Sequence, residues 1–241
     1  MTHSRNCILI SSARSGTNLF LSLYEELFPN DIILGEIFRK TGDSLDKLPE
    51  ILNASEEDIL AKSRESPAQL WDELQAAASR TQRGLIAKIF YEHGRRHTEI
   101  WDKFKEGSKI IHLVRKNPFD AYVSLEVARQ SDAWKSTSPN QEKVAGITLE
   151  IDPFAAEDFI EEISDCVKGV REFFKGADFH EIMYEDIAAS PQTAIKQVAD
   201  IFGVEPSLNK REFGLKKQNT IPHQDRIKNY DFVSYLDNSV F

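Results

Sequence analysis

The sequence is poor in cysteine and has no long apolar run. Only two of its 241 residues are cysteine, Cys7 and Cys166, and their spacing is not that of metal ligands. A disulfide scaffold and a zinc site are both poorly supported, so we expect no metal and a cytoplasmic location. The polar residues Met1 to Asn6 precede an apolar run of about five residues, too short for a signal peptide or a membrane span. We therefore expect no transmembrane segment.

Positive charge is also in deficit. The chain has 30 Lys and Arg against 39 Asp and Glu, a formal net charge of −9, and the acidic residues are spread along the whole sequence. A protein whose main function is to hold a nucleic acid would carry the opposite balance. We expect no nucleic-acid partner, and any phosphate site must be a local feature.

The apolar residues are sufficient for a core, because 41% of the chain is hydrophobic, and at this length we expect one α/β domain spanning residues 1–241. Short apolar runs predict strands at 7–10, 32–34, 85–90, 109–114 and 180–184. Helical patterns lie between or after them at 67–82, 98–104, 117–130, 153–175 and 190–203. This alternation predicts a mostly parallel β-sheet flanked by helices on both faces.

One region does not follow the alternation. Residues 41–66 are charged and have weak helical periodicity, so this stretch looks inserted and mobile. The following segment, Pro67 to Gln82, begins with proline and is rich in helix-forming residues. We expect a helical insertion at about 41–82, where acceptor specificity could reside.

The segment SSARSGTN, residues 11–18, lies where the first strand gives way to a helix. Free backbone N–H groups and the helix dipole favour an anion at such a place. A nucleoside-triphosphate P-loop needs two glycines around a four-residue gap and then Lys-Ser or Lys-Thr, and here the first glycine and the lysine are missing. ATP hydrolysis is thus a poor interpretation. Taken alone, the segment fits an anion loop and a turn in which Ser15 caps a helix equally well.

Residues 12–19, SARSGTNL, resemble the 5′-phosphosulfate loop of sulfotransferases that depend on PAPS (3′-phosphoadenosine 5′-phosphosulfate). A second family signature binds the 3′-phosphate through an Arg after a strand and a Ser about eight residues later, and it is similar to LVRKNPFDAYVS, residues 113–124. Arg115 precedes Ser124 by nine positions and Lys116 precedes it by eight, so either could be the cation, and we favour Arg115.

The resemblance extends along nearly the whole chain. Residues 123–134 resemble a segment of the bacterial trehalose and nodulation sulfotransferases, and residues 184–204 resemble the strand-and-helix ending of the family. Residues 217–218 and 227–230 are similar to its C-terminal loop. The resemblance implies a P-loop-like fold, PAPS as co-substrate with PAP as product, and a small-molecule or glycolipid acceptor. A homodimer is left open.

The resemblance also implies which residues bind the donor. In the first motif these are Arg14, Ser15, Gly16, Thr17 and Asn18. Because arginine is permanently charged, Arg14 would also act in catalysis by stabilising the departing 5′-phosphate.

The second motif and the end of the chain supply the other donor ligands. Arg115 and Ser124 would hold the 3′-phosphate, and Lys217 would belong to a loop that closes over the nucleotide or the acceptor.

Glu36 is the leading candidate for the general base. It follows the second strand at the Gly35 turn and should project from the sheet edge that carries the donor loop; GEIF, residues 35–38, also resembles the trehalose-type group. His93 is the second candidate, because other sulfotransferase groups use a histidine beyond a middle strand. The Lys88 head group should reach an anion or a carboxylate, since it lies within an apolar strand.

Two other functions remain open from the sequence. The first is a P-loop-like kinase, which the missing lysine disfavours. The second is a non-catalytic protein that binds PAP or another nucleotide. Trp134 either stacks on a sugar ring or fills the core.

Overall fold

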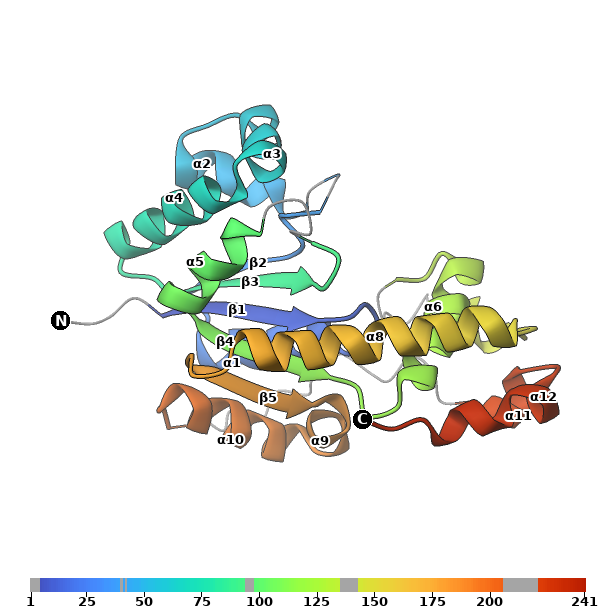
Figure 1. Cartoon of the computed structure of the whole chain (residues 1–241). Coiled ribbons are helices and arrows are strands. Elements are labelled where there is room, and N and C mark those ends of the chain that lie inside the picture. Colours follow the sequence, from blue (N-terminus) through green and yellow to red (C-terminus); the bar gives the residue numbers. More distant parts are fainter. Residues whose placement is uncertain (1–4, 40, 42, 94–97, 135–142, 206–220) are drawn as a thin grey trace.

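The computed structural model describes residues 5–39, 41, 43–93, 98–134, 143–205 and 221–241. Its described strands form one parallel sheet of five strands in the order β2-β3-β1-β4-β5 (Figure 1). The strands are β1 (Asn6–Ser11), β2 (Ile32–Leu34), β3 (Leu85–Phe90), β4 (Lys109–Val114) and β5 (Phe179–Met183). The predicted parallel sheet is confirmed. Because all five strands run in the same direction, their carboxyl ends form one edge of the sheet.

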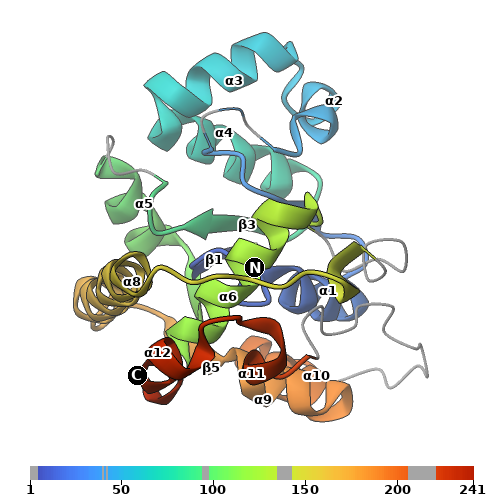
Figure 2. The same ribbon diagram turned by 90° about the vertical axis from the view of Figure 1, so that its right-hand side faces the viewer.

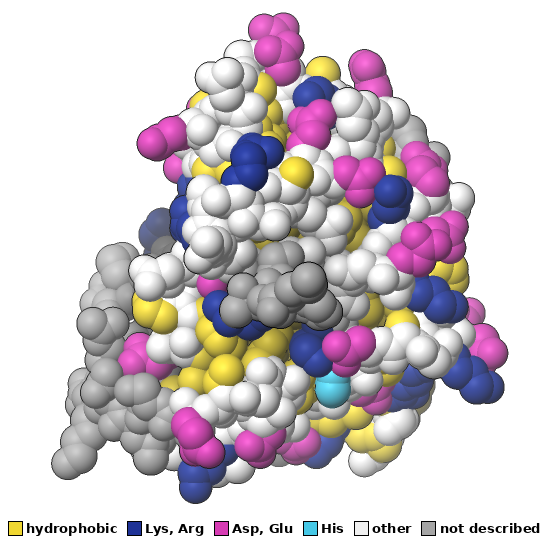
Figure 3. Space-filling model, turned by 90° about the vertical axis from the view of Figure 1, so that its left-hand side faces the viewer, with side chains coloured by type: hydrophobic (Ala, Val, Ile, Leu, Met, Phe, Trp, Pro, Cys, Tyr) yellow, Lys and Arg dark blue, Asp and Glu magenta, His cyan; other side chains and the backbone are white. Residues whose placement is uncertain are grey.

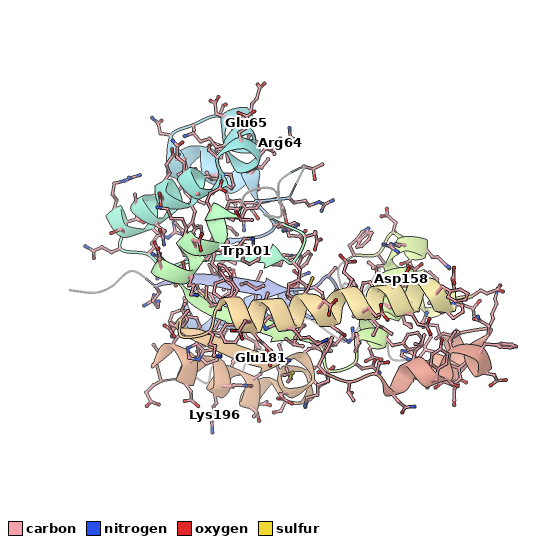
Figure 4. The ribbon with its side chains drawn as sticks, in the orientation of Figure 1. Arg64, Glu65, Trp101, Asp158, Glu181 and Lys196 are labelled. Atoms are coloured by element: carbon pink, nitrogen blue, oxygen red, sulfur yellow. The ribbon has the colours of Figure 1, made fainter. Side chains whose placement is uncertain are left out.

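Helices cover both faces of the sheet, as predicted. On one face lie α1 (Thr17–Leu27), α9 (Tyr184–Ala189) and α10 (Pro191–Phe202). On the other lie α4 (Pro67–Arg80), α5 (Glu99–Gly107) and α8 (Pro153–Phe173). Alternate strand residues enter the two cores; Leu9 of β1 belongs to the first core, and its neighbours Ile8 and Ile10 belong to the second. Figure 4 shows Trp101 of α5 and Glu181 of β5 on the two sides of α8.

The region between β2 and α4 is helical and packed. It contains η1 (Leu45–Lys47), α2 (Leu48–Leu52) and α3 (Glu56–Glu65). Leu48 and Ile59 are fully buried in the same core as Trp71 of α4. We expected residues 41–66 to be mobile, but their few apolar side chains lie on the sheet-facing core. Weak periodicity arose because single apolar residues, and not a continuous stripe, make these contacts.

A third group of helices lies beyond the carboxyl edge of the sheet. It consists of α6 (Pro118–Ser131), α11 (His223–Arg226), α12 (Tyr230–Val233) and η2 (Ser234–Asn238), with the first part of α8. Figure 2, which faces this edge, shows α11 and α12 beside α6. This third core brings the last described segment, residues 221–241, next to the segment that follows β4.

At the amino-terminal edge of the sheet, the described part of the surface has no large patch of a single charge sign. Lys and Arg side chains are mixed with Asp and Glu side chains on the face at the amino-terminal ends of the strands (Figure 3). Of the helices in the described ranges, none combines the length and the apolar character needed to cross a membrane.

Candidate donor and catalytic site

The loop between β1 and α1 has an unusual backbone. Arg14 and Gly16 both have positive φ, 66° and 83°, so the chain turns sharply before α1 begins at Thr17. Ser12 Oγ and Ser15 Oγ form a hydrogen bond of 2.7 Å within the turn. The N-cap of α1 is Gly16, and the described residues provide no side-chain cap there. The alternative in which Ser15 only caps the helix is therefore not what the structure shows.

Gly16 is required by its surroundings as well as by its φ. A Cβ on Gly16 would overlap the ring of Tyr184, the first residue of α9. The sequence predicted a strand through Tyr184, but β5 ends at Met183, and the ring instead covers the loop. Gly16 therefore cannot be replaced without moving Tyr184. With glycine at this position, the backbone N–H groups in the first turn of α1 stay open to an anion.

The two sequence motifs converge at this loop. Arg14 Nε donates to Ser124 Oγ at 3.1 Å, and Arg115 donates to the carbonyl oxygen of Arg14 at 3.0 Å. Burial and the adjacent Arg115 charge both lower the pKa of Arg14. The structure therefore places two arginines and a buried serine around the start of α1, although they come from distant parts of the chain.

Arg115 is better placed than Lys116 for binding an anion here. Arg115 is 6% exposed, and its guanidinium lies 5.0 Å from the centre of the Tyr184 ring and donates to Asp120 Oδ2 at 3.0 Å. Its Nε is buried and has no hydrogen-bond partner among the described residues. The Lys116 side chain is 48% exposed, and its Nζ lies 2.8 Å from Asp186. Lys116 therefore points to α9 and away from Ser124.

Glu36 and Lys88 form a largely buried pair near the same loop. Lys88 Nζ lies 2.9 Å from Glu36 Oε1, and their side chains are 8% and 15% exposed. The same Nζ donates to Asn18 Oδ1 at 3.5 Å, so Lys88 connects the donor loop to the candidate base. The expectation that Lys88 reaches a carboxylate is confirmed. Arg39 lies 4.0 Å from the other carboxylate oxygen, Glu36 Oε2.

The helical region 41–82 supports the turn that carries Glu36. Ser44 Oγ accepts a hydrogen bond of 2.8 Å from the Gly35 N–H, and Asp43 Oδ2 accepts one of 3.4 Å from the Glu36 N–H. The orientation of the candidate base therefore depends on residues just before η1.

His93 is buried close to the same pair, with Glu36 and Lys88 near enough to act on its charge. Its pKa is lowered by burial, which outweighs the opposite effect of Glu92 and Glu36. His93 Nδ1 accepts a hydrogen bond of 3.2 Å from the Phe90 N–H, so a neutral ring carries its proton on Nε2. Such a ring has no lone pair left for a substrate proton, which favours Glu36 as the base.

A second charged cluster, which the sequence analysis did not predict, lies beside Arg115. His223 lies between two carboxylates, with Nε2 at 3.2 Å from Asp120 Oδ1 and Nδ1 at 2.7 Å from Asp237 Oδ1. Because both ring nitrogens face carboxylates, we interpret the cluster as an ion-pair network. No spacing could reveal it, since its members come from α6, α11 and η2 and meet only in the third core.

Two further predicted residues have different outcomes. Lys217 lies outside the described residues. Trp134 is 49% exposed, so it does not fill the core, and its carbonyl oxygen accepts a hydrogen bond of 2.8 Å from Arg14. The backbone of Trp134 thus lies next to the Arg14 side chain.

Comparison with known proteins identifies the family. The model of the sulfotransferase domain family matches residues 4–229. No curated protein sequence matches the chain at a significant level.

Two solved sulfotransferase structures share the fold of this chain. A sulfotransferase domain from the curacin biosynthetic pathway has a TM-score of 0.51 and 18% identity over 91% of this chain and 79% of its own. A sulfotransferase from Alicyclobacillus acidocaldarius has a TM-score of 0.51 and 15% identity over 96% and 91% of the two chains. A shikimate kinase from Bacteroides thetaiotaomicron aligns with a TM-score of 0.42 and 10% identity, over 83% of this chain and 99% of its own. Because the family model spans most of the sequence, the chain belongs to the sulfotransferase domain family and is a PAPS-dependent sulfotransferase enzyme.

Proposed function

We propose that this enzyme transfers the sulfuryl group of PAPS to a hydroxyl of a carbohydrate or glycolipid acceptor, giving PAP and a sulfate ester. The single observation that carries the proposal is the cluster of Arg14, Arg115 and Ser124 at the start of α1. It joins the two phosphate motifs into one cationic site within a chain of net charge −9. We further propose one domain over residues 1–241 and action in the cytoplasm without a metal.

Two observations support PAPS as the donor at this site. The buried Nε of Arg115 has no partner within the described part of the chain, as expected of a donor that awaits an anion. The turn at Gly16 leaves the first backbone N–H groups of α1 directed at one place. The 3′-phosphate would bind Arg115 and Ser124, and the 5′-phosphosulfate would bind Arg14 and the backbone of residues 15–18. When bound, PAPS supplies the activated sulfuryl group.

The acceptor side uses Glu36. With Oε1 held by Lys88, the other oxygen, Oε2, would accept the proton from the acceptor hydroxyl. The positive charges of Lys88 and Arg14 would stabilise the negative charge that develops on the sulfuryl and phosphate oxygens. Trp134 is half-exposed and its carbonyl oxygen accepts from Arg14, so its ring would offer a stacking surface for a sugar. Region 41–82 would tune acceptor choice because it holds the Glu36 turn.

Donor binding is the first test. Isothermal titration with PAP, and separately with ATP and magnesium, compares the proposed donor product with a kinase substrate, and a melting-temperature shift provides a second readout. We expect PAP to bind and to stabilise the fold, and ATP to do neither. Stabilisation by ATP without PAP binding would instead support a kinase.

Transfer itself is tested with labelled PAPS and a panel of sugars, glycolipids and simple phenols. Label on a carbohydrate-bearing acceptor supports the proposal. Transfer to phenols only would refute the acceptor class, and tight PAP binding without transfer to any acceptor would indicate a non-catalytic nucleotide-binding protein.

A further inference from the structure

We propose that His223 is a positioning residue for Arg115, acting as an imidazolium that holds Asp120 and thereby links residues 221–241 to the donor site. The proposal rests on the proposed function in one respect, since Arg115 is taken to bind the 3′-phosphate. It adds a residue from the far end of the chain that neither motif contains.

The contacts form one continuous chain from Arg115 to the C-terminal helices. Asp120 accepts from Arg115 through Oδ2 at 3.0 Å and pairs with His223 through Oδ1 at 3.2 Å. His223 pairs with Asp237 Oδ1 at 2.7 Å, and the remaining oxygen, Asp237 Oδ2, accepts from the Tyr230 hydroxyl at 2.7 Å. Each carboxylate oxygen in this chain therefore has a separate partner.

The backbone beside Arg115 is fixed by the same segment. Asn117 Nδ2 donates to the carbonyl oxygen of Asp237 at 2.8 Å, while its Oδ1 caps α6 by accepting from Phe119 and Asp120. The Phe241 N–H donates to the carbonyl oxygen of Lys116 at 3.2 Å. Residues 221–241 thus contact four of the five positions that follow Arg115, namely Lys116, Asn117, Phe119 and Asp120.

The protonation of His223 decides whether both carboxylates can be held. An imidazole donates through both nitrogens only when it is protonated, and the groups facing His223 are Asp120 and the Phe119 ring from α6 and Asp237 from η2. Burial acts against the charged ring, but the hydrogen bonds and charges of Asp120 and Asp237 raise the pKa of His223 above its ordinary value. Burial also opposes ionisation of Asp120, yet His223 and Arg115 together lower the pKa of Asp120 to about 2.

Loss of the proton that makes His223 an imidazolium should weaken donor binding for two reasons. Two cations and two carboxylates cancel when His223 is protonated, whereas the neutral ring leaves one uncompensated negative charge beside the phosphate site. A neutral His223 ring would also release the longer of its two contacts, the one to Asp120. Asp120 could then turn both carboxylate oxygens towards Arg115. Because the folded-state pKa of His223 is raised, its contribution is complete at low pH and is lost as the pH rises through that raised value.

The test is PAP affinity by calorimetry as a function of pH, in wild type and in His223→Gln. At about pH 6.5 we expect the variant to bind PAP roughly fivefold more weakly, and we expect the difference to shrink towards about pH 9. Ionisation of PAP phosphates is common to both proteins and cancels in the ratio. The matched control is His180→Gln, because His180 also pairs with an aspartate, Asp178, but lies in β5 away from the carboxyl edge. A constant ratio over the whole pH range, or an equal loss in the control, would refute the proposal.

An NMR measurement separates this inference from the proposed function. In the free wild-type protein the Arg115 Nε–H resonance should be sharp below the pKa of His223, and it should broaden in His223→Gln while the His180→Gln spectrum is unchanged. If wild type fails to bind PAP but the resonance responds in this way, the function fails and the positioning role stands. If PAP binds normally and the resonance is the same in both variants, the positioning role is wrong and the function stands.

Discussion

Arg115 donates a hydrogen bond of 3.0 Å to the backbone carbonyl of Arg14, although 101 positions separate the two residues in the sequence. The contact joins the carboxyl ends of β1 and β4, which are neighbours in the sheet. It sets the position of the Arg14 peptide, whose positive φ allows the turn before α1. The geometry of the donor loop thus depends on a residue of the second motif.

Replacing Arg115 should remove the main anion contact. We expect Arg115→Ala to weaken PAP binding by roughly two decades or more in calorimetry, because a buried guanidinium loses its charge-assisted hydrogen bonds. Lys116→Ala is the matched control: its side chain is half exposed and paired with Asp186, so PAP affinity should stay within about twofold of wild type. Loss of affinity in the lysine variant alone would reverse the assignment.

Replacing Gly16 should distort the loop from the other side. We expect Gly16→Ala to lower the free energy of unfolding by about 2–4 kcal/mol in urea denaturation, and to weaken PAP binding, because the new Cβ is both at positive φ and against the Tyr184 ring. Gly203→Ala separates the two causes, since Gly203 also has positive φ but would meet nothing within 4 Å. It should cost only about 1 kcal/mol. Equal losses would show that the Tyr184 contact is unimportant.

The sequence was sufficient to predict the parallel sheet and to locate the two phosphate motifs. The strands at 85–90 and 109–114 agree with β3 and β4 because each is a continuous apolar run, and α6 begins where Asn117-Pro118 predicts an N-cap. The sequence favoured Arg115 over Lys116 only through the family resemblance, because the geometric reason depends on the directions in which two consecutive side chains leave the end of β4. Those directions are set by the partner Asp186 in α9 and by the Tyr184 ring.

Other features depend on tertiary contacts and could not be predicted from local sequence patterns. His223 and Asp237 have no local pattern, since short helices that pack against α6 bring them to Asp120. The packing of Leu48 and Ile59 was hidden for a different reason, because isolated apolar residues within charged helices carry little periodic signal.

Removing the Glu36 carboxylate should separate catalysis from donor binding. We expect Glu36→Gln to keep PAP affinity within about twofold but to reduce kcat by roughly two to four decades, the range expected for a lost general base. An exposed glutamate on α8 provides the control, and Glu161→Gln should leave kcat unchanged. Normal turnover in Glu36→Gln together with loss in His93→Gln would transfer the role of base to His93.

A hydrogen-bonded network around Glu181 should give the fold a distinct acid response. Glu181 accepts two hydrogen bonds of 2.8 Å from Arg171 and pairs with His112 Nδ1 at 3.0 Å, and the Tyr91 hydroxyl lies 2.8 Å from the other ring nitrogen. Burial lowers the pKa of His112, so the ring is neutral at ordinary pH and can donate to Glu181 while it accepts from Tyr91. Burial opposes ionisation of Glu181, but His112 and Arg171 lower the pKa of Glu181 to about 2.

We therefore expect Glu181→Gln to lower the free energy of unfolding by about 1–3 kcal/mol near neutral pH, measured by urea denaturation at a series of pH values. A carboxylate whose pKa is depressed in the folded state contributes above its unfolded-state pKa and loses that contribution as the pH falls towards the folded value. The stability gap between wild type and variant should accordingly narrow between about pH 5 and about pH 2. Glu172→Gln is the control, because Glu172 is largely exposed and its ion pair with Lys175 is long, at 3.9 Å. If the gap keeps its full size down to acid pH, Glu181 stabilises the fold by packing and not by charge.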